Sequence, residues 1–96
     1  MVMMYAEFKV PSTVWQTVLA KSLPGWTLIQ KDADYMQFRS PTQELFAVAK
    51  VDETFVVFRH GLMIRRVAEF AALAKTLDVE SRKTFDMKDA IVEEEN

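Results

Sequence analysis

Residues 26–59 constrain the fold of this chain more than any other stretch. The segment reads WTLIQKDADYMQFRSPTQELFAVAKVDETFVVFR, with four runs of alternating apolar and polar residues separated by short polar clusters. Alternation is typical of half-buried β-strands, and the clusters at residues 31–34, 41–44 and 52–53 are rich in residue types that favour turns. The stretch therefore predicts an antiparallel meander of four short strands.

The residues before the meander predict a strand and a helix. Residues 5–10 alternate apolar and polar side chains, which indicates a strand that Pro11 ends. Thr13 and Gln16 have the spacing of a capping box, so a helix is expected to begin there and to end at Pro24-Gly25. The side chains expected on its buried stripe are Val14, Trp15, Val18, Leu19 and Leu23, with Gln16, Thr17, Ala20 and Lys21 on the exposed side.

The residues after the meander predict a second helix. His60-Gly61 breaks the strand pattern, and a broadly apolar helix is expected from Leu62 to roughly Asp78. Arg65 and Glu69 lie one helical turn apart and are expected to pair on its surface. The buried face is expected to be centred on Met63, Val67, Phe70, Ala71 and Ala74. So broad an apolar face is explained either by core packing or by a dimer interface.

These elements predict an α+β fold with the order β-α-β-β-β-β-α. Both helices are expected on one face of a largely antiparallel sheet, since meanders commonly leave the other face open to solvent. Residues 1–80 are expected to form a single domain, because 96 residues supply material for one core. Residues 81–96 are expected to form a C-terminal extension, either a short helix or a frayed tail, which ends in Glu93, Glu94 and Glu95.

The lengths of the turns decide which side chains share a face of the meander, because side chains alternate along a strand. If all three turns contain an even number of residues, the cross-strand pairs are Gln30 with Tyr35, Arg39 with Phe46, and Lys50 with Phe55. One face is then apolar and is assigned to the core. Its residues are Thr27, Ile29, Met36, Phe38, Ala47, Ala49, Val56 and Phe58.

The opposite, open face then carries rows in which aromatic rings alternate with cations. Such rows are open to two interpretations. Cross-strand ring and charge pairs are ordinary sheet stabilisation, with exposed cation–π contacts of about 0.5–1 kcal/mol. Trp, Tyr and Arg are also the residues that dominate interface energetics. The candidate partner-binding residues are Trp26, Tyr35, Arg39, Phe46, Lys50, Phe55 and Arg59.

The composition argues against catalysis. The chain has no cysteine, a single histidine (His60) and two glycines, which leaves no thiol nucleophile, no His/Cys zinc set and no phosphate-binding glycine loop. The serines lie in no nucleophile-elbow context. We therefore expect no catalytic residues, no metal site and no cofactor.

The expected function is that of a non-catalytic protein-interaction module, a small regulator, inhibitor or adaptor such as phage and other mobile elements encode. The same aromatic and basic face also suits a single-stranded nucleic-acid-binding protein, the alternative, although the net charge of −2 argues against general nucleic-acid affinity. A second copy of the chain is the other partner considered, which would make a homodimer. No membrane partner is expected, and the cytoplasm is the expected location.

Overall fold

One five-stranded antiparallel sheet organises residues 12–86, the part of the chain that the computed structural model describes. The strands lie in sequence order, β1-β2-β3-β4-β5, so each pairs with its neighbour in the chain. The elements are α1 (Ser12–Lys21), β1 (Thr27–Asp32), β2 (Tyr35–Arg39), β3 (Leu45–Val51), β4 (Thr54–Arg59), β5 (Leu62–Val67), the 3-10 turn η2 (Phe70–Ala72) and α2 (Leu73–Ser81).

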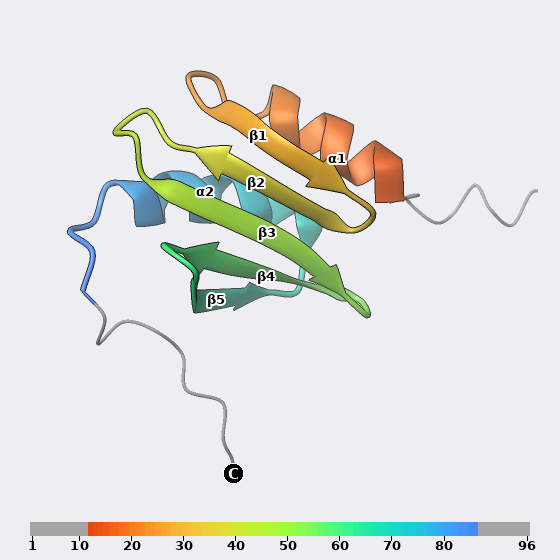
Figure 1. Ribbon diagram of the computed structural model, residues 1–96. Helices are drawn as coiled ribbons and strands as arrows, with labels where there is room; N and C mark the ends of the chain where they lie inside the picture. The colour runs from red at the N-terminus through yellow and green to blue at the C-terminus, as the bar shows by residue number, and fades with distance from the viewer. Residues whose placement is uncertain (1–11, 87–96) are drawn as a thin grey trace, which may run out of the picture.

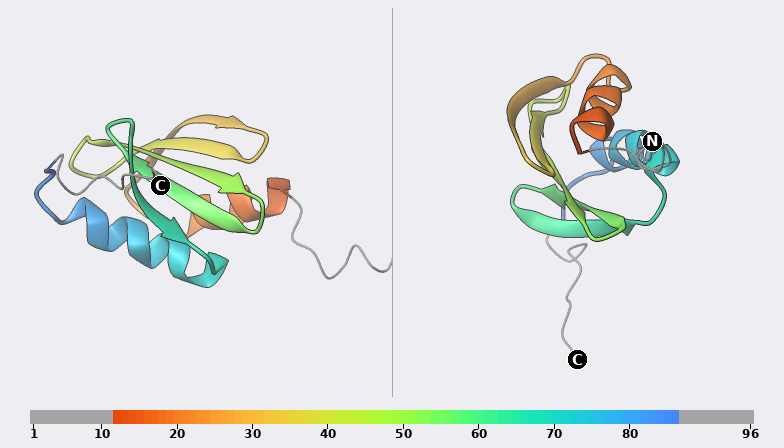
Figure 2. Two further views of the ribbon diagram at one scale, coloured as in Figure 1. Left: turned by 90° about the horizontal axis from the view of Figure 1, so that it is seen from below. Right: turned by 90° about the vertical axis from the view of Figure 1, so that its right-hand side faces the viewer.

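Both helices cover the same face of the sheet (Figures 1 and 2). The core between them takes Trp15 and Leu19 from α1 and Leu73 and Leu77 from α2. These side chains pack against sheet residues that alternate along the strands, namely Met36, Phe38, Phe46, Val48, Phe55 and Val57. The predicted single α+β domain with an antiparallel sheet and two helices is therefore confirmed. The predicted strand at residues 5–10 and the acidic end of the chain lie outside the described residues.

The fifth strand corrects the predicted second helix. Residues 62–67 form β5, which pairs with β4, so the expected helix from Leu62 to roughly Asp78 is wrong in its first part. His60 and Gly61 both have positive φ angles, 54° and 83°, which is the backbone geometry of a tight hairpin turn. The chain therefore folds back on β4 immediately. The expected Arg65–Glu69 pair does not form on a helix, and Arg65 Nε instead lies 3.0 Å from Glu80 Oε2.

Helix α1 is rotated from its predicted orientation. Val14 and Val18, expected to be buried, are 44% and 42% exposed, whereas Gln16, expected on the wet side, is 1% exposed. The Gln16 side chain does not reach back along the helix. Its Nε2 donates hydrogen bonds to the carbonyls of Asp32 and Tyr35, the latter at 2.9 Å. The expected role of Gln16 in a capping box is therefore wrong. Its side-chain amide instead connects α1 to the two residues that flank the β1–β2 turn.

The register of β3 differs from the predicted one. The turn at Asp52-Glu53 has the expected two residues, and the predicted pair Lys50–Phe55 is confirmed. Between β2 and β3, however, Ser40 N donates to Glu44 O at 2.8 Å, which leaves an odd, three-residue loop at 41–43. Arg39 therefore pairs with Leu45, and Phe46 pairs with Phe38. The predicted pair Arg39–Phe46 is wrong by one residue, and a shift of one exchanges the two faces of every later strand.

The register of β1 also differs. The turn between β1 and β2 has two residues, Ala33 and Asp34, so Asp32 pairs with Tyr35 and Gln30 lies opposite Gln37; a bulge between Leu28 and Gln30 then shifts the pairing of Leu28 and Thr27. The predicted pair Gln30–Tyr35 is therefore wrong. Within residues 12–86, β1 lies at an edge of the sheet, and all six of its residues are exposed. No buried face constrains its register, and the alternation of its residues carries little information there.

Candidate functional site

The sheet face opposite the helices is the candidate site, and we call it the open face. The strand pairings place small and apolar side chains of β3, β4 and β5 on it, together with polar residues of β2. Ala47 and Val56 are buried at its floor, whereas Tyr35, Leu45 and Phe58 remain partly exposed. The residues of the open face include Tyr35, Gln37, Arg39, Leu45, Ala47, Ala49, Val56, Phe58, Met63 and Arg66.

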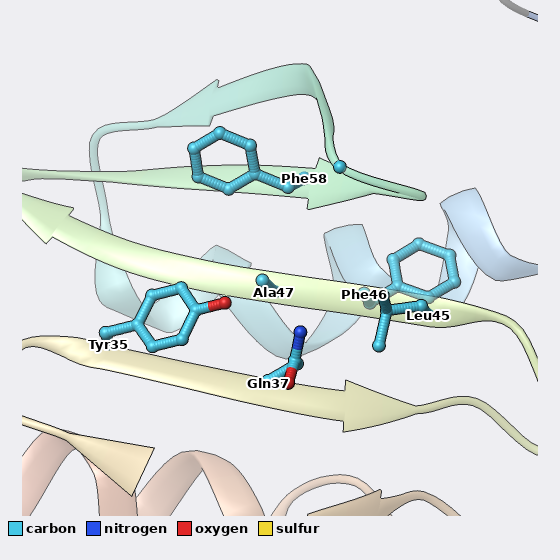
Figure 3. Close-up of a pocket in the computed structure, with 7 residues that line it drawn as sticks. Tyr35, Gln37, Leu45, Phe46, Ala47 and Phe58 are labelled. Atoms are coloured by element: carbon cyan, nitrogen blue, oxygen red, sulfur yellow. The ribbon is translucent and has the colours of Figure 1, made fainter. Parts of the chain in front are cut away.

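The open face is hollowed over its central strand. A hollow of about 210 Å³ lies over Ala47 and is lined by Tyr35, Gln37, Leu45, Phe46, Ala47, Phe58 and Gly61. Figure 3 shows Tyr35 and Gln37 on β2 and Phe58 on β4, on either side of Ala47. Strand twist makes an open sheet saddle-shaped, and the small alanine in the middle strand deepens the saddle. The result is a shallow trough along β3 with an apolar floor.

Of the predicted partner-binding residues, only Tyr35 and Arg39 lie on the open face. Phe46, Phe55 and Arg59 are no more than 5% exposed and belong to the interior beneath the helices. Lys50 pairs with Phe55, so it lies on the helix side of the sheet, and its Nζ donates to Asp52 O at 3.3 Å. Trp26 is partly buried against the core. The predicted surface rows of rings and cations are therefore wrong, because the three-residue loop at 41–43 turns the inward sides of β3 and β4 outward.

Part of the predicted row nevertheless exists inside the protein. The rings of Trp26 and Phe46 meet edge to face at 5.1 Å between centroids, and the Arg59 guanidinium carbon lies 5.2 Å from the centre of Phe46. Arg59 donates to the backbone carbonyls of Glu80 at 2.6 Å and Lys83 at 2.8 Å. It also donates to the carboxylate of Glu44. A cation at the C-terminal end of a helix stabilises its last carbonyls, so Arg59 caps α2 and has a structural role.

Sequence reasoning missed most of the residues that line the trough. The predicted register assigns Ala47 and Phe58 to the core and leaves Leu45 unassigned, since it counts the loop before β3 as even. The usual signal for a three-residue hairpin loop is glycine or asparagine in the left-handed conformation at its end. Here Gln43 takes that position, with φ of 71°. Glutamine is uncommon in this conformation, so no sequence signal marked the loop.

The described residues show neither a metal-binding cluster nor a membrane-spanning helix. Within residues 12–86, no three His, Asp or Glu side chains are grouped so as to hold a metal ion. His60 is exposed and its Nε2 lies 3.9 Å from Glu44 Oε2, while its ring packs edge-on against Phe85 at 4.7 Å between centroids. Over the same residues, neither helix has the length and apolar character needed to cross a bilayer.

Comparisons with known proteins found no relative: no family model, curated protein or solved structure matches the chain. The functional proposal therefore depends on the geometry of the chain itself.

Proposed function

We propose that this protein is a non-catalytic protein-interaction module and that its partner lies on the open face. The observation that carries the proposal is the trough over Ala47, an apolar hollow of about 210 Å³ that neither helix covers. Partly exposed Leu45, Phe58 and Tyr35 surround it. Apolar patches bordered by polar groups on small proteins mark interaction sites, and Gln37 and Arg39 provide the polar border here.

The shape of the trough favours an amphipathic helix of the partner as the contacting element. Ala47 and Ala49 alternate along β3, so a helix can approach the strand closely, with Tyr35 and Gln37 on one side and Phe58 on the other. The seven residues of β3 span about 23 Å, which about 15 helical residues would cover. Such a helix would place apolar residues at i, i+3, i+4 and i+7 in the trough. Regulators, inhibitors and adaptors all act in this way, by occupying a partner without chemistry.

The alternative, single-stranded nucleic-acid binding, has less support on this face. Base stacking needs exposed rings, and phosphate contacts need exposed cations. Phe46 and Phe55, two rings counted for this role, are buried, and Lys50 and Arg59, two of the cations counted, lie on the helix side. Of the cations counted for this role, Arg39 is exposed on the open face.

We also propose the cytoplasm as the location of the protein, on the grounds of its composition alone.

Photo-crosslinking tests the proposal. p-Benzoylphenylalanine placed at position 45, on the open face, should crosslink one defined protein in cells, whereas the same residue at position 14, exposed on α1, should not. The protein captured is then purified and its affinity for the unmodified chain is measured. Leu45→Arg, at a partly exposed position of the trough, should lower that affinity at least tenfold with little change in melting temperature, and Val14→Arg should change neither quantity. Equal crosslinking from positions 45 and 14 would contradict the proposal, and a product of twice the chain's mass would identify the partner as a second copy.

A further inference from the structure

A second hollow, which we call the basic groove, lies between β5 and α2. Its volume is about 500 Å³, and Figure 2 shows the two elements that form it, β5 and the helix that follows it. The residues that line the trough over Ala47 and those that line the basic groove are different, although Arg66 of the groove lies on the same sheet face as Val56. The groove is lined by Arg65, Arg66, Val67, Ala72, Lys75, Thr76, Val79, Glu80 and Lys83.

The charge of the basic groove is strongly positive although the chain as a whole is acidic. Four of the lining residues are Arg or Lys and one is Glu, an excess of three positive charges in a chain of net charge −2. Glu80 Oε2 is shared by Arg65 Nε at 3.0 Å and Lys83 Nζ at 3.1 Å, so one buried carboxylate serves two cations. The side chains of Arg65 and Lys83 keep 42% and 47% of their surface exposed. A cleft lined by one sign of charge concentrates ligands of the other sign.

The groove also includes the edge of the sheet. Within residues 12–86, β5 pairs with β4 alone, which leaves its outer side without a strand partner. Arg65 and Arg66 are successive residues of β5, and successive side chains point to opposite faces of a sheet. A hollow lined by both therefore reaches around the strand edge. An unpaired edge is a template on which an extended peptide adds as a further strand.

We propose that the basic groove binds an extended acidic peptide segment of a partner protein, which pairs with β5 as a sixth strand. Its carboxylates would meet Arg65, Arg66, Lys75 and Lys83. Apolar residues at alternate positions would contact Val67, Ala72 and Val79, the apolar part of the lining. The six residues of β5 match a peptide of about six to eight residues. No aromatic ring lines the groove, so stacking of bases has no platform there, and a peptide fits the lining better than a single-stranded nucleic acid.

The test is a fluorescence-anisotropy titration of the full chain with a labelled peptide of alternating Glu and Val, eight residues long. We expect saturable binding that weakens roughly threefold or more when salt is raised from about 0.05 M to about 0.3 M, since exposed charges are screened. Lys75→Glu should weaken binding about tenfold, a change of about 1.4 kcal/mol. Lys21→Glu, the same charge change at an exposed position of α1, should leave binding unchanged. Lys75 is exposed, so Lys75→Glu should keep the parent melting temperature, whereas Lys21→Glu should lower it slightly because it reverses the charge in the last turn of α1.

Two further probes separate strand addition from simple charge attraction. N-methylation at every second residue removes the N–H donors along one edge of an extended peptide, because successive N–H groups point to opposite edges. Two peptides are compared, one methylated at the odd and one at the even positions. The peptide that is blocked on the edge facing β5 should lose most of its affinity. If both methylated registers bind as well as the parent peptide, the strand-addition part of the proposal is wrong. Equal affinity for a Lys and Val peptide would overturn the proposal as a whole.

The remaining outcomes concern other occupants. Glu93, Glu94 and Glu95 of the same chain could compete with the peptide for the groove. In that case the peptide should bind more tightly to a variant in which all three are changed to Gln. Such a gain in affinity would support the preference of the groove for acidic segments. Tighter binding of labelled oligothymidylate than of the acidic peptide, lost in Lys75→Glu, would overturn the proposal in favour of nucleic acid. Absence of peptide binding to both the parent chain and the Gln variant would also overturn it. None of these results bears on the trough over Ala47, because no residue that lines the trough also lines the groove.

Discussion

Arg59 Nη1 donates a 2.6 Å hydrogen bond to the backbone carbonyl of Glu80, and so joins the end of β4 to the last turn of α2. The same guanidinium donates to the carbonyl of Lys83 and the carboxylate of Glu44. With 3% of its surface exposed, Arg59 is a buried cation. A residue that would suit a binding surface by its type is thus a cap for a helix.

Arg59→Ala should destabilise the fold strongly. The substitution leaves the carbonyls of Glu80 and Lys83 without their donor and the Glu44 carboxylate without its cation. Breaking a buried charged network by removing one partner costs about 3 kcal/mol or more. Urea unfolding followed by circular dichroism should show a lower midpoint. Arg39→Ala, which removes the same side chain from an exposed position, should shift the midpoint little, and equal shifts for the two variants would contradict the capping role.

Phe46→Ala and Leu45→Ala should differ sharply, because these neighbours lie on opposite faces of β3. Phe46 is fully buried and packs against Trp26, so its truncation should cost about 3–5 kcal/mol. Leu45 is partly exposed on the open face, and its truncation should cost about 1 kcal/mol. Thermal melts of the two variants measure the difference. A larger loss of stability in Leu45→Ala than in Phe46→Ala would support the predicted register, in which Phe46 faces solvent.

Gln16→Ala should loosen the attachment of α1 to the sheet. Its amide donates to the carbonyls of Asp32 and Tyr35, and these lose a donor in the variant. Each buried carbonyl left without a partner costs about 1–3 kcal/mol. The expected results are a lower unfolding midpoint and faster amide hydrogen exchange in α1. Val18→Ala, at an exposed position of the same helix, is the control, and an equal effect there would show that the amide of Gln16 has no special role.

Gln43→Gly should stabilise the protein. Gln43 has φ of 71°, a left-handed conformation that costs a residue with a Cβ about 1 kcal/mol and costs glycine little. Its backbone carbonyl, which accepts from Arg39 Nη1 at 3.4 Å, is unchanged in the variant. We expect a gain of about 0.5–1 kcal/mol in urea unfolding, the usual range for relief of this kind. Gln30→Gly in β1 should instead lose stability, since glycine weakens a strand. A loss in both variants would contradict the strain at Gln43.

The alternation within each strand was readable from the sequence. The existence of β1 to β4, the approximate positions of the turns between them and the pair Lys50–Phe55 all follow from local periodicity and turn composition, although only the turn at Asp52-Glu53 has the predicted length. The core positions Trp15, Leu19, Met36 and Phe38 were also predicted correctly. These features depend on neighbouring residues alone, which is why one sequence predicts them.

The outward direction of β3 and β4 was decided by the tertiary structure. Ser40-Pro41-Thr42-Gln43-Glu44 suits an even or an odd turn by its residue types, and only the hydrogen bond from Ser40 N to Glu44 O makes the loop odd. That bond aligns Phe46 with Phe38 and places both beneath the helices, where burial of their rings offsets the left-handed strain at Gln43. Tertiary packing also decided that Leu62–Val67 is a strand. This segment has no clear helix or strand periodicity, so its pairing with β4 determines its conformation. Local pattern determined where strands form, and packing between distant segments determined which of their faces meets solvent.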